Sequence, residues 1–294
     1  MQDGRALWQK LLKSPSVWIG FLLVFVIALM GVCAPLLTAS DPSAINPSNR
    51  NKLPGYEVTE RDDEGKKITK TVHMGTDSLG RDVYSRVVFG ARVSLIVGLS
   101  VAVLSISLGL LIGLVSGYFR RIDSIVMRVM DGLMAIPAIL LAIALVSLSG
   151  ASLGTVIAAV AIPEIPRVVR LVRSIVLSIR EEPYVEAAIS VGTPTAKILW
   201  RHVLPNTIAP LIVQATFICG SAILVEAILS FLGVGIPPEI PTWGNIMAEG
   251  RSSFQLFPHN ILYPGIFLAL TVLGINMLGD GLRDTIDPRM SKKL

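Results

Sequence analysis

Long apolar stretches alternate along this chain with short polar loops, and most of those loops carry arginine or lysine. A helix rises 1.5 Å per residue and the hydrocarbon core of a bilayer is ~30 Å thick, so about 20 apolar residues can cross it. Turn-forming residues at 147–152 divide one long stretch into two. The pattern therefore predicts an all-α membrane protein with six transmembrane helices, at residues 17–38, 93–118, 132–149, 153–173, 207–233 and 260–280.

The basic residues predict the orientation of these helices, because short loops rich in Lys and Arg stay in the cytoplasm. Both termini are therefore expected inside, together with the loop at 181–206. The outer loop at 39–92 is also charged, but loops approaching 60 residues have little influence on orientation. With six spans, four basic groups fall on one side: Arg5, Lys10 and Lys13; Arg120, Arg121 and Arg128; Arg167, Arg170, Arg173, Arg180, Lys197 and Arg201; and Arg283, Arg289, Lys292 and Lys293.

The composition agrees with a membrane protein. Hydrophobic residues make up 52% of the chain and charged residues 16%, whereas about 25% charged residues are usual in soluble domains. The net charge of +5 lies in loops beside apolar runs, so it is explained by orientation and predicts no nucleic-acid partner. Cys33 and Cys219 both lie in apolar runs without metal-type spacing, as expected of small buried side chains.

One predicted span carries a stripe of small residues. Ser105, Gly109, Gly113 and Gly117 recur every four residues, so they share one face of a helix. Small side chains let a neighbouring backbone approach closely within a membrane. The stripe predicts a tight helix contact, either with another span of this chain or with a second subunit.

Residues 186–205, EAAISVGTPTAKILWRHVLP, form a polar piece between two apolar spans. Pro183 suits the first turn of a helix, and Gly192 supplies a turn. Thr193 and Pro194 have the types of an N-cap and a first helical residue, and Pro205 is expected to end the second helix. We call this piece the cassette; it predicts two short helices on the cytoplasmic side that dock to another protein.

The cassette resembles the cytoplasmic EAA loop of ABC importer permeases, with His202 at a position that is hydrophobic in the family pattern. Four further segments, 74–95, 226–235, 237–244 and 278–288, are similar to the dipeptide and oligopeptide branch of that family. The resemblance covers nearly the whole chain from the first span onward. The residues that match the EAA loop, and that the resemblance assigns to ATPase coupling, are Glu186, Ala187, Ala188, Gly192, Leu204 and Pro205.

The chain is thus identified as similar to the second, C-type permease subunit of a peptide-type importer, with the type I permease fold. The resemblance divides it into residues 1–92, a tail, first helix and outer loop, and residues 93–294, a five-helix core containing the coupling loop at 181–206. It implies residence in a bacterial inner membrane, and transport of dipeptides, longer peptides, glutathione, nickel chelates or some sugars.

The same resemblance implies a set of partners. They are a homologous second permease that supplies the other half of the pore, two cytoplasmic ABC ATPases and an extracytoplasmic solute-binding protein. The ATPases would use ATP and Mg²⁺, while this chain would bind no cofactor and would not be an enzyme. Its own sequence contains no G-x-x-x-x-G-K-[ST] phosphate loop.

Polar residues within the spans are candidates for the translocation path. A charge at the depth of Glu226 costs at least ~2.5 kcal/mol, so its carboxyl must face protein or water. Either it lines the path, or it is structural, accepting hydrogen bonds from a neighbouring helix or carrying a proton. Gln214 and Asn276 are further candidates for the lining, or alternatively hydrogen-bond between helices.

On the outer face, the resemblance implies that segments 75–86 and 242–250 meet the solute-binding protein. The candidate contacts are Asp77, Arg81, Asp82 and Trp243. Trp243 has an alternative interpretation as an anchor at the lipid interface, where tryptophan is common.

Two other function classes have sequence signatures that can be compared with this chain. A secondary transporter for peptides or ions would show paired halves with broken spans and ion-site carboxylates near the midplane. An intramembrane enzyme would need a nucleophile with a base, or paired carboxylates. The predicted topology separates His202 from His73 and His259, which excludes a three-histidine zinc centre. Neither class explains a docking cassette.

Overall fold

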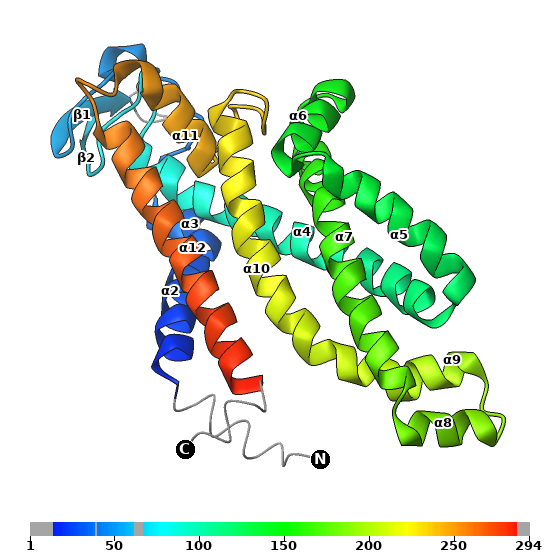
Figure 1. The fold of residues 1–294 in the computed structure, drawn as a ribbon. Coiled ribbons are helices and arrows are strands. Elements are labelled where there is room, and N and C mark those ends of the chain that lie inside the picture. The colour runs from blue at the N-terminus through cyan, green and yellow to red at the C-terminus, as the bar shows by residue number, and fades with distance from the viewer. Residues whose placement is uncertain (1–13, 39, 62–66, 287–294) are drawn as a thin grey trace.

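The computed structural model describes residues 14–38, 40–61 and 67–286. This part is mostly helical, and its long helices lie side by side with a β-hairpin at one end and the short helices α8 and α9 at the other (Figure 1). Basic residues 5, 10, 13, 289, 292 and 293, which contribute to the orientation argument, lie outside the described residues.

Four helices are long and apolar enough to cross a membrane, or five if one bent pair counts as a single span. The described part of the chain is therefore a helical membrane protein with four or five candidate spans. The four are Pro15–Val32, Val83–Tyr118, Thr195–Phe231 and His259–Thr285. The main helices are α2 (Pro15–Val32), α4 (Val83–Tyr118), α7 (Leu153–Arg180), α10 (Leu204–Phe231) and α12 (His259–Ile286).

The third predicted span, 132–149, is not a single helix. Its residues belong to α5 (Arg120–Ala135) and α6 (Ala138–Ser149), which meet at 89°. Pro137 lies at the bend, and the preceding Ile136 is extended, as steric contact with a proline ring requires. The turn predicted at 147–152 does separate α6 from α7, where Ser152 and Thr155 form a capping box.

The outer loop departs from the all-α prediction. Strands β1 (Tyr56–Arg61) and β2 (Lys67–Val72) form an antiparallel hairpin in which Tyr56 pairs with Val72. Val58 and Val72 are buried on one face, which explains why the hairpin packs against the rest of the outer end. The sequence signal for this hairpin is the four β-branched residues in KITKTV, namely Ile68, Thr69, Thr71 and Val72. The remaining short elements are α3 (Ala34–Leu37), η1 (Pro47–Asn49), α11 (Trp243–Gly250) and η3 (Arg251–Ser253).

The small-residue stripe of α4 packs against α7, so its partner is another helix of this chain. Gly109, Gly113 and Gly117 face Val168, Val172 and Val176 in turn. The Ser105 hydroxyl adds a hydrogen bond of 3.2 Å to the Ala161 carbonyl. This contact is the most extensive between two helices in the described structure.

A glycine-to-alanine pair tests the contact. A Cβ on Gly113 would lie 2.7 Å from the Val172 Cβ and 3.0 Å from the Val169 carbonyl oxygen, whereas Gly132 of α5 has nothing within 4 Å. Gly113→Ala is therefore expected to destabilise the chain by about 1–3 kcal/mol through overpacking. Gly132→Ala should be neutral or stabilise it by up to ~1 kcal/mol, since alanine is the better helix former. Thermal unfolding in detergent measures both, and equal stability of the two variants would contradict the close approach.

Candidate functional site

The cassette projects from the end of the bundle as two short helices joined by a tight turn (Figure 1). Helix α8 spans Pro183–Ser190, with Pro183 in its first turn as expected. Gly192 follows with φ of +76°, and the backbone N–H groups of Gly192 and Thr193 donate to the carbonyls of Ile189 and Ala188. These are the two bonds of a Schellman cap, which favours glycine because a Cβ is strained at positive φ.

The second half of the cassette differs from the prediction. Helix α9 (Thr195–Ile198) has Pro194, not Thr193, as its N-cap, and it continues through a π turn, η2 (Leu199–Val203), into α10. Pro205 therefore does not end a helix but lies in the first turn of α10. The π turn accommodates the missing N–H, since the Leu204 N–H bonds five residues back to the Leu199 carbonyl.

Of the predicted coupling residues, Glu186, Ala187, Gly192 and Pro205 are exposed, while Ala188 and Leu204 are half-buried. Beneath them Val185, Ile198 and Val203 are buried and join the hydrophobic core. Glu186 also lines a cavity of about 570 Å³ at this end, together with Arg120, Arg173 and Arg180. The buried side chains thus anchor the cassette to the hydrophobic core, while most of the coupling residues remain exposed on its surface.

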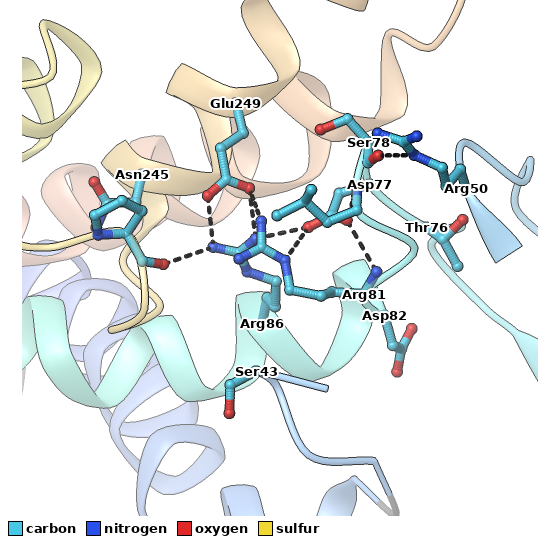
Figure 2. A network of polar contacts seen from close by, with 12 residues as sticks. Ser43, Arg50, Thr76, Asp77, Ser78, Arg81, Asp82, Arg86, Asn245 and Glu249 are labelled. Atoms are coloured by element: carbon cyan, nitrogen blue, oxygen red, sulfur yellow. Dashed lines mark hydrogen bonds and ion pairs between the residues drawn. The ribbon is translucent and has the colours of Figure 1, made fainter. Parts of the chain in front are cut away.

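At the opposite end, a compact ion network joins the start of α4 to α11 (Figure 2). The guanidinium groups of Arg81 and Arg86 lie between the carboxylates of Asp77 and Glu249. Arg81 Nε and Arg86 Nη1 reach Asp77 Oδ2 at 2.7 and 2.6 Å. Arg86 Nη1 is also 2.6 Å from Glu249 Oε2, which Arg81 contacts as well. Two positive and two negative side chains therefore neutralise each other with little solvent contact.

The predicted binding-protein contacts lie inside this outer end. Asp77, Arg81 and Asp82 are 2%, 5% and 8% exposed, and Trp243 is fully buried. Trp243 Nε1 donates to the Val87 carbonyl at 3.0 Å, so the side chain does not reach a lipid interface. In this conformation these side chains are enclosed by the protein and have little contact with solvent.

Asp82 links the hairpin to the first helical turn of α4. Its carboxylate accepts hydrogen bonds from the Tyr84 and Ser85 N–H groups, and it lies 3.7 Å from the Lys70 ammonium of β2. Burial raises the pKa of the Asp82 carboxyl above its ordinary value, and the charge of Lys70 opposes that shift. The hairpin is therefore tied to α4 by a charge pair as well as by packing.

The three path candidates are not brought together. Glu226 is fully buried, and its Oε1 accepts a 2.8 Å hydrogen bond from Ser230. Gln214 precedes Glu226 by twelve residues on α10, about 18 Å along the helix axis. The Asn276 side chain of α12 is directed at Gly220, where its oxygen lies 3.2 Å from the position of an added Cβ. In this conformation Glu226 supports the end of α10 and does not face an open path.

Sequence reasoning missed three charged residues that form buried or partly buried ion pairs in the structure. Arg86 and Glu249 complete the outer network, yet 163 positions separate them, so no local pattern joins them. Glu164, in the middle of α7, is 5% exposed and pairs with Arg167 at 3.1 Å. The i,i+3 spacing of Glu164 and Arg167 is a signal that could have indicated this pair.

Comparisons with known proteins give a consistent result. A family described as "Binding-protein-dependent transport system inner membrane component" matches residues 86–292. A second, "N-terminal TM domain of oligopeptide transport permease C", matches residues 4–54.

Individual relatives are similar over nearly their full length. A probable peptide ABC transporter permease of Sinorhizobium fredii is 50% identical, covering 96% of this chain and 91% of the relative. A dipeptide transport system permease of Alkalihalophilus pseudofirmus is 41% identical, covering 97% and 90%. An oligopeptide transport system permease of Bacillus subtilis is 34% identical, covering 93% and 86%.

Substitutions in two ion pairs test how much the outer network contributes to the stability of the protein. Asp77→Asn leaves two guanidinium groups facing a single carboxylate in a buried site, which is expected to cost about 3–5 kcal/mol of stability. Asp131→Asn removes a partner of Arg170 from an exposed pair, with side chains 61% and 46% exposed, and is expected to cost less than ~1 kcal/mol. Thermal unfolding of the purified protein measures both. If Asp131→Asn were as destabilising as Asp77→Asn, the network would not hold the outer end together.

Proposed function

The chain belongs to the family of inner membrane components of binding-protein-dependent transport systems, and we propose that it forms half of the translocation pore of an ATP-driven peptide importer. It is a multi-pass inner-membrane protein with a transport role. Peptides are proposed as the solute because the relatives are named as peptide, dipeptide and oligopeptide permeases.

The proposal includes the partners that such a half-pore requires. They are a homologous second permease, two cytoplasmic ABC ATPases that use ATP and Mg²⁺, and an extracytoplasmic solute-binding protein. The family description supports the last of these, since it names transport that depends on a binding protein.

The exposed apolar surface of α8 and the turn after it is the observation that carries the proposal. Tyr184, Ile189 and Val191 are 46%, 48% and 81% exposed at the polar end of the bundle. Clustered apolar side chains outside the membrane mark an interaction site. We place Glu186 and Ala187 at the contact with an ATPase, which moves α8 when the two ATPases close on ATP.

A topology of six spans with both termini inside fits this role. The bent pair α5–α6 would count as one span, and α7 as another, since its 28 residues extend about 42 Å. Internal pairing of Glu164 with Arg167 reduces the cost of placing α7 in the membrane. This arrangement places the cassette in the cytoplasm and the hairpin outside, where the surface above the ion network would meet the binding protein.

The proposal also includes a division of the chain at residue 92 and a set of residues that line the translocation path. The separate family matches at 4–54 and 86–292 support an N-terminal unit followed by a permease core. Glu226, Gln214 and Asn276 would contribute to the path only in a conformation other than the one described, in which α10 moves relative to α12.

The ATP requirement tests the function directly. Proteoliposomes that hold both permeases, the ATPases and the binding protein should accumulate a labelled dipeptide only with ATP. Omission of the ATPases should reduce uptake to the level of empty vesicles, because the chain has no phosphate loop of its own. Uptake by the permeases alone would contradict the proposal and would indicate a secondary transporter.

Substitution of Gly192 tests the coupling role. A Cβ added to Gly192 would have no neighbouring atom within 4 Å, so only the backbone strain at its positive φ disfavours a side chain there. Gly192→Val is expected to distort the turn and reduce uptake at least tenfold while ATP hydrolysis continues, because a β-branched residue is strained at that φ by ~1–2 kcal/mol or more. Gly192→Asn should retain uptake, since asparagine tolerates this conformation.

Gly150 provides the matched control. It has φ of +83°, and its added Cβ also meets nothing within 4 Å, but it lies between α6 and α7 and not in the cassette. Gly150→Val should therefore keep uptake and ATP hydrolysis coupled. Unaltered coupling in Gly192→Val, or the same loss in Gly150→Val, would remove the turn from the coupling mechanism.

A further inference from the structure

The helix that begins in the cassette is longer than a membrane is thick. It runs without interruption from Thr195 to Phe231, 37 residues, or about 55 Å, whereas the hydrocarbon core is ~30 Å thick. Its first turns, in α9 and η2, therefore extend beyond the hydrocarbon at the cassette end, where α9 lies near the level of the ends of α2 and α12 (Figure 1).

These first turns carry a basic and aromatic cluster with no partner among the described residues. Lys197 and Arg201 are exposed and form no ion pair or side-chain hydrogen bond with any other described residue. Trp200, between them, is 74% exposed. Tryptophan flanked by basic residues is the composition that favours the headgroup layer on the cytoplasmic side of a membrane.

An apolar strip leads from this cluster into the membrane-spanning part of α10. Trp200, Leu204, Ile208 and Ile212 follow one another at four-residue steps, and Ile208 and Ile212 are 49% and 48% exposed. The distance from Trp200 to Ile212 is about 18 Å along the helix axis, which fits within one leaflet, roughly 20 Å deep with its headgroups.

The strip ends in an apolar groove of about 490 Å³ formed by α2, α4, α10 and α12. Val24, Ile106, Ile212 and Leu278, one from each helix, lie at the end of the groove nearer the cassette. Its lining is almost entirely aliphatic, and its volume lies in the range of small-ligand sites, ~300–1,000 Å³. A groove of this chemistry within the bilayer accepts hydrocarbon.

We propose that the cluster, the strip and the groove together form a binding site for one anionic phospholipid of the leaflet that faces the cassette. Its phosphate binds Lys197 and Arg201, its glycerol lies beside Trp200, and an acyl chain follows Ile208 and Ile212 into the groove. The site would hold the start of α10 at the membrane surface. It depends on this end of α10 lying at a bilayer surface and not on which solute is transported.

A span of the second permease is the competing occupant of the groove. An apolar span would account for the groove but not for Lys197 and Arg201 at the end of the strip. An anionic lipid matches both ends of the surface, since it carries a phosphate and a hydrocarbon chain in one molecule. The basic cluster is continuous with the apolar groove through the strip, and this continuity favours the lipid over a span of the second permease.

Lipid retention by the purified importer complex tests the site. The complex would be equilibrated in detergent with equal phosphatidylglycerol and phosphatidylcholine, and retained lipid counted by native mass spectrometry. We expect at least a tenfold preference for phosphatidylglycerol at one site per copy of this chain. The double variant Lys197→Gln/Arg201→Gln should abolish the preference, and Ala215→Phe, which fills the groove, should lower retention of both lipids.

A matched control removes the same charge elsewhere. Arg121 and Arg128 of α5 are exposed and form no ion pair with a described residue, so Arg121→Gln/Arg128→Gln should retain lipid as the unmodified complex does. Equal loss in this control, or unchanged preference in the Lys197→Gln/Arg201→Gln variant, would overturn the proposal.

Two further outcomes would also overturn it. If Ala215→Phe released the second permease while phosphatidylglycerol stayed bound, the groove would be a subunit interface. If glycerophosphoglycerol, which has no acyl chains, displaced phosphatidylglycerol at equal concentration, the cluster would bind an anion without the groove. Neither readout depends on transport, so failure here is distinct from failure of the proposed importer function.

Discussion

The close approach of α4 and α7 is the contact on which the rest of the structure depends. Under the proposed topology both helices lie in the bilayer, where the hydrophobic effect does not drive apolar helices together, so packing and hydrogen bonds must do so. Glycines every fourth residue on α4 remove the side chains that would hold α7 away, and Val168, Val172 and Val176 fill the space. The same device recurs between α2 and α12, where a Cβ on Gly20 would lie 2.6 Å from the Leu278 backbone nitrogen.

This contact connects the two functional ends of the molecule. The start of α4 carries Arg86 of the outer network, and its 36 residues extend about 54 Å toward the cassette end. There the Arg180 side chain, at the end of α7, donates to the Tyr118 carbonyl at the end of α4. Arg173 of α7 also pairs with Asp123 of α5. The α4–α7 pair is therefore tied at the cassette end as well as along its packed length.

Sequence reasoning succeeded where one helix face or one turn determined the outcome. The four-residue spacing identified the stripe, and Gly192 identified the cassette turn, because both follow from local geometry. Periodicity shows which face is packed but not what packs on it, so the sequence alone does not identify the partner of the stripe. The prediction that Pro205 ends a helix is wrong because a proline removes only one N–H, which the π turn at 199–203 accommodates. The Arg86–Glu249 pair depends on tertiary contact alone.

The helices that flank the cassette differ in how close to it their prolines lie, and this difference affects how a movement of the cassette would be transmitted. Helix α8 follows α7, which is locked to α4, whereas α9 is continuous with α10 through the π turn. Pro205 and Pro210 each remove a backbone hydrogen bond near the start of α10, whereas Pro163 and Pro166 of α7 lie at least 14 residues before its cassette end at Arg180. Under the proposed function, a force applied to the cassette would therefore bend α10 before it displaced α7. Helix α10 packs against α4, α12 and α11, so such bending would change its packing against all three.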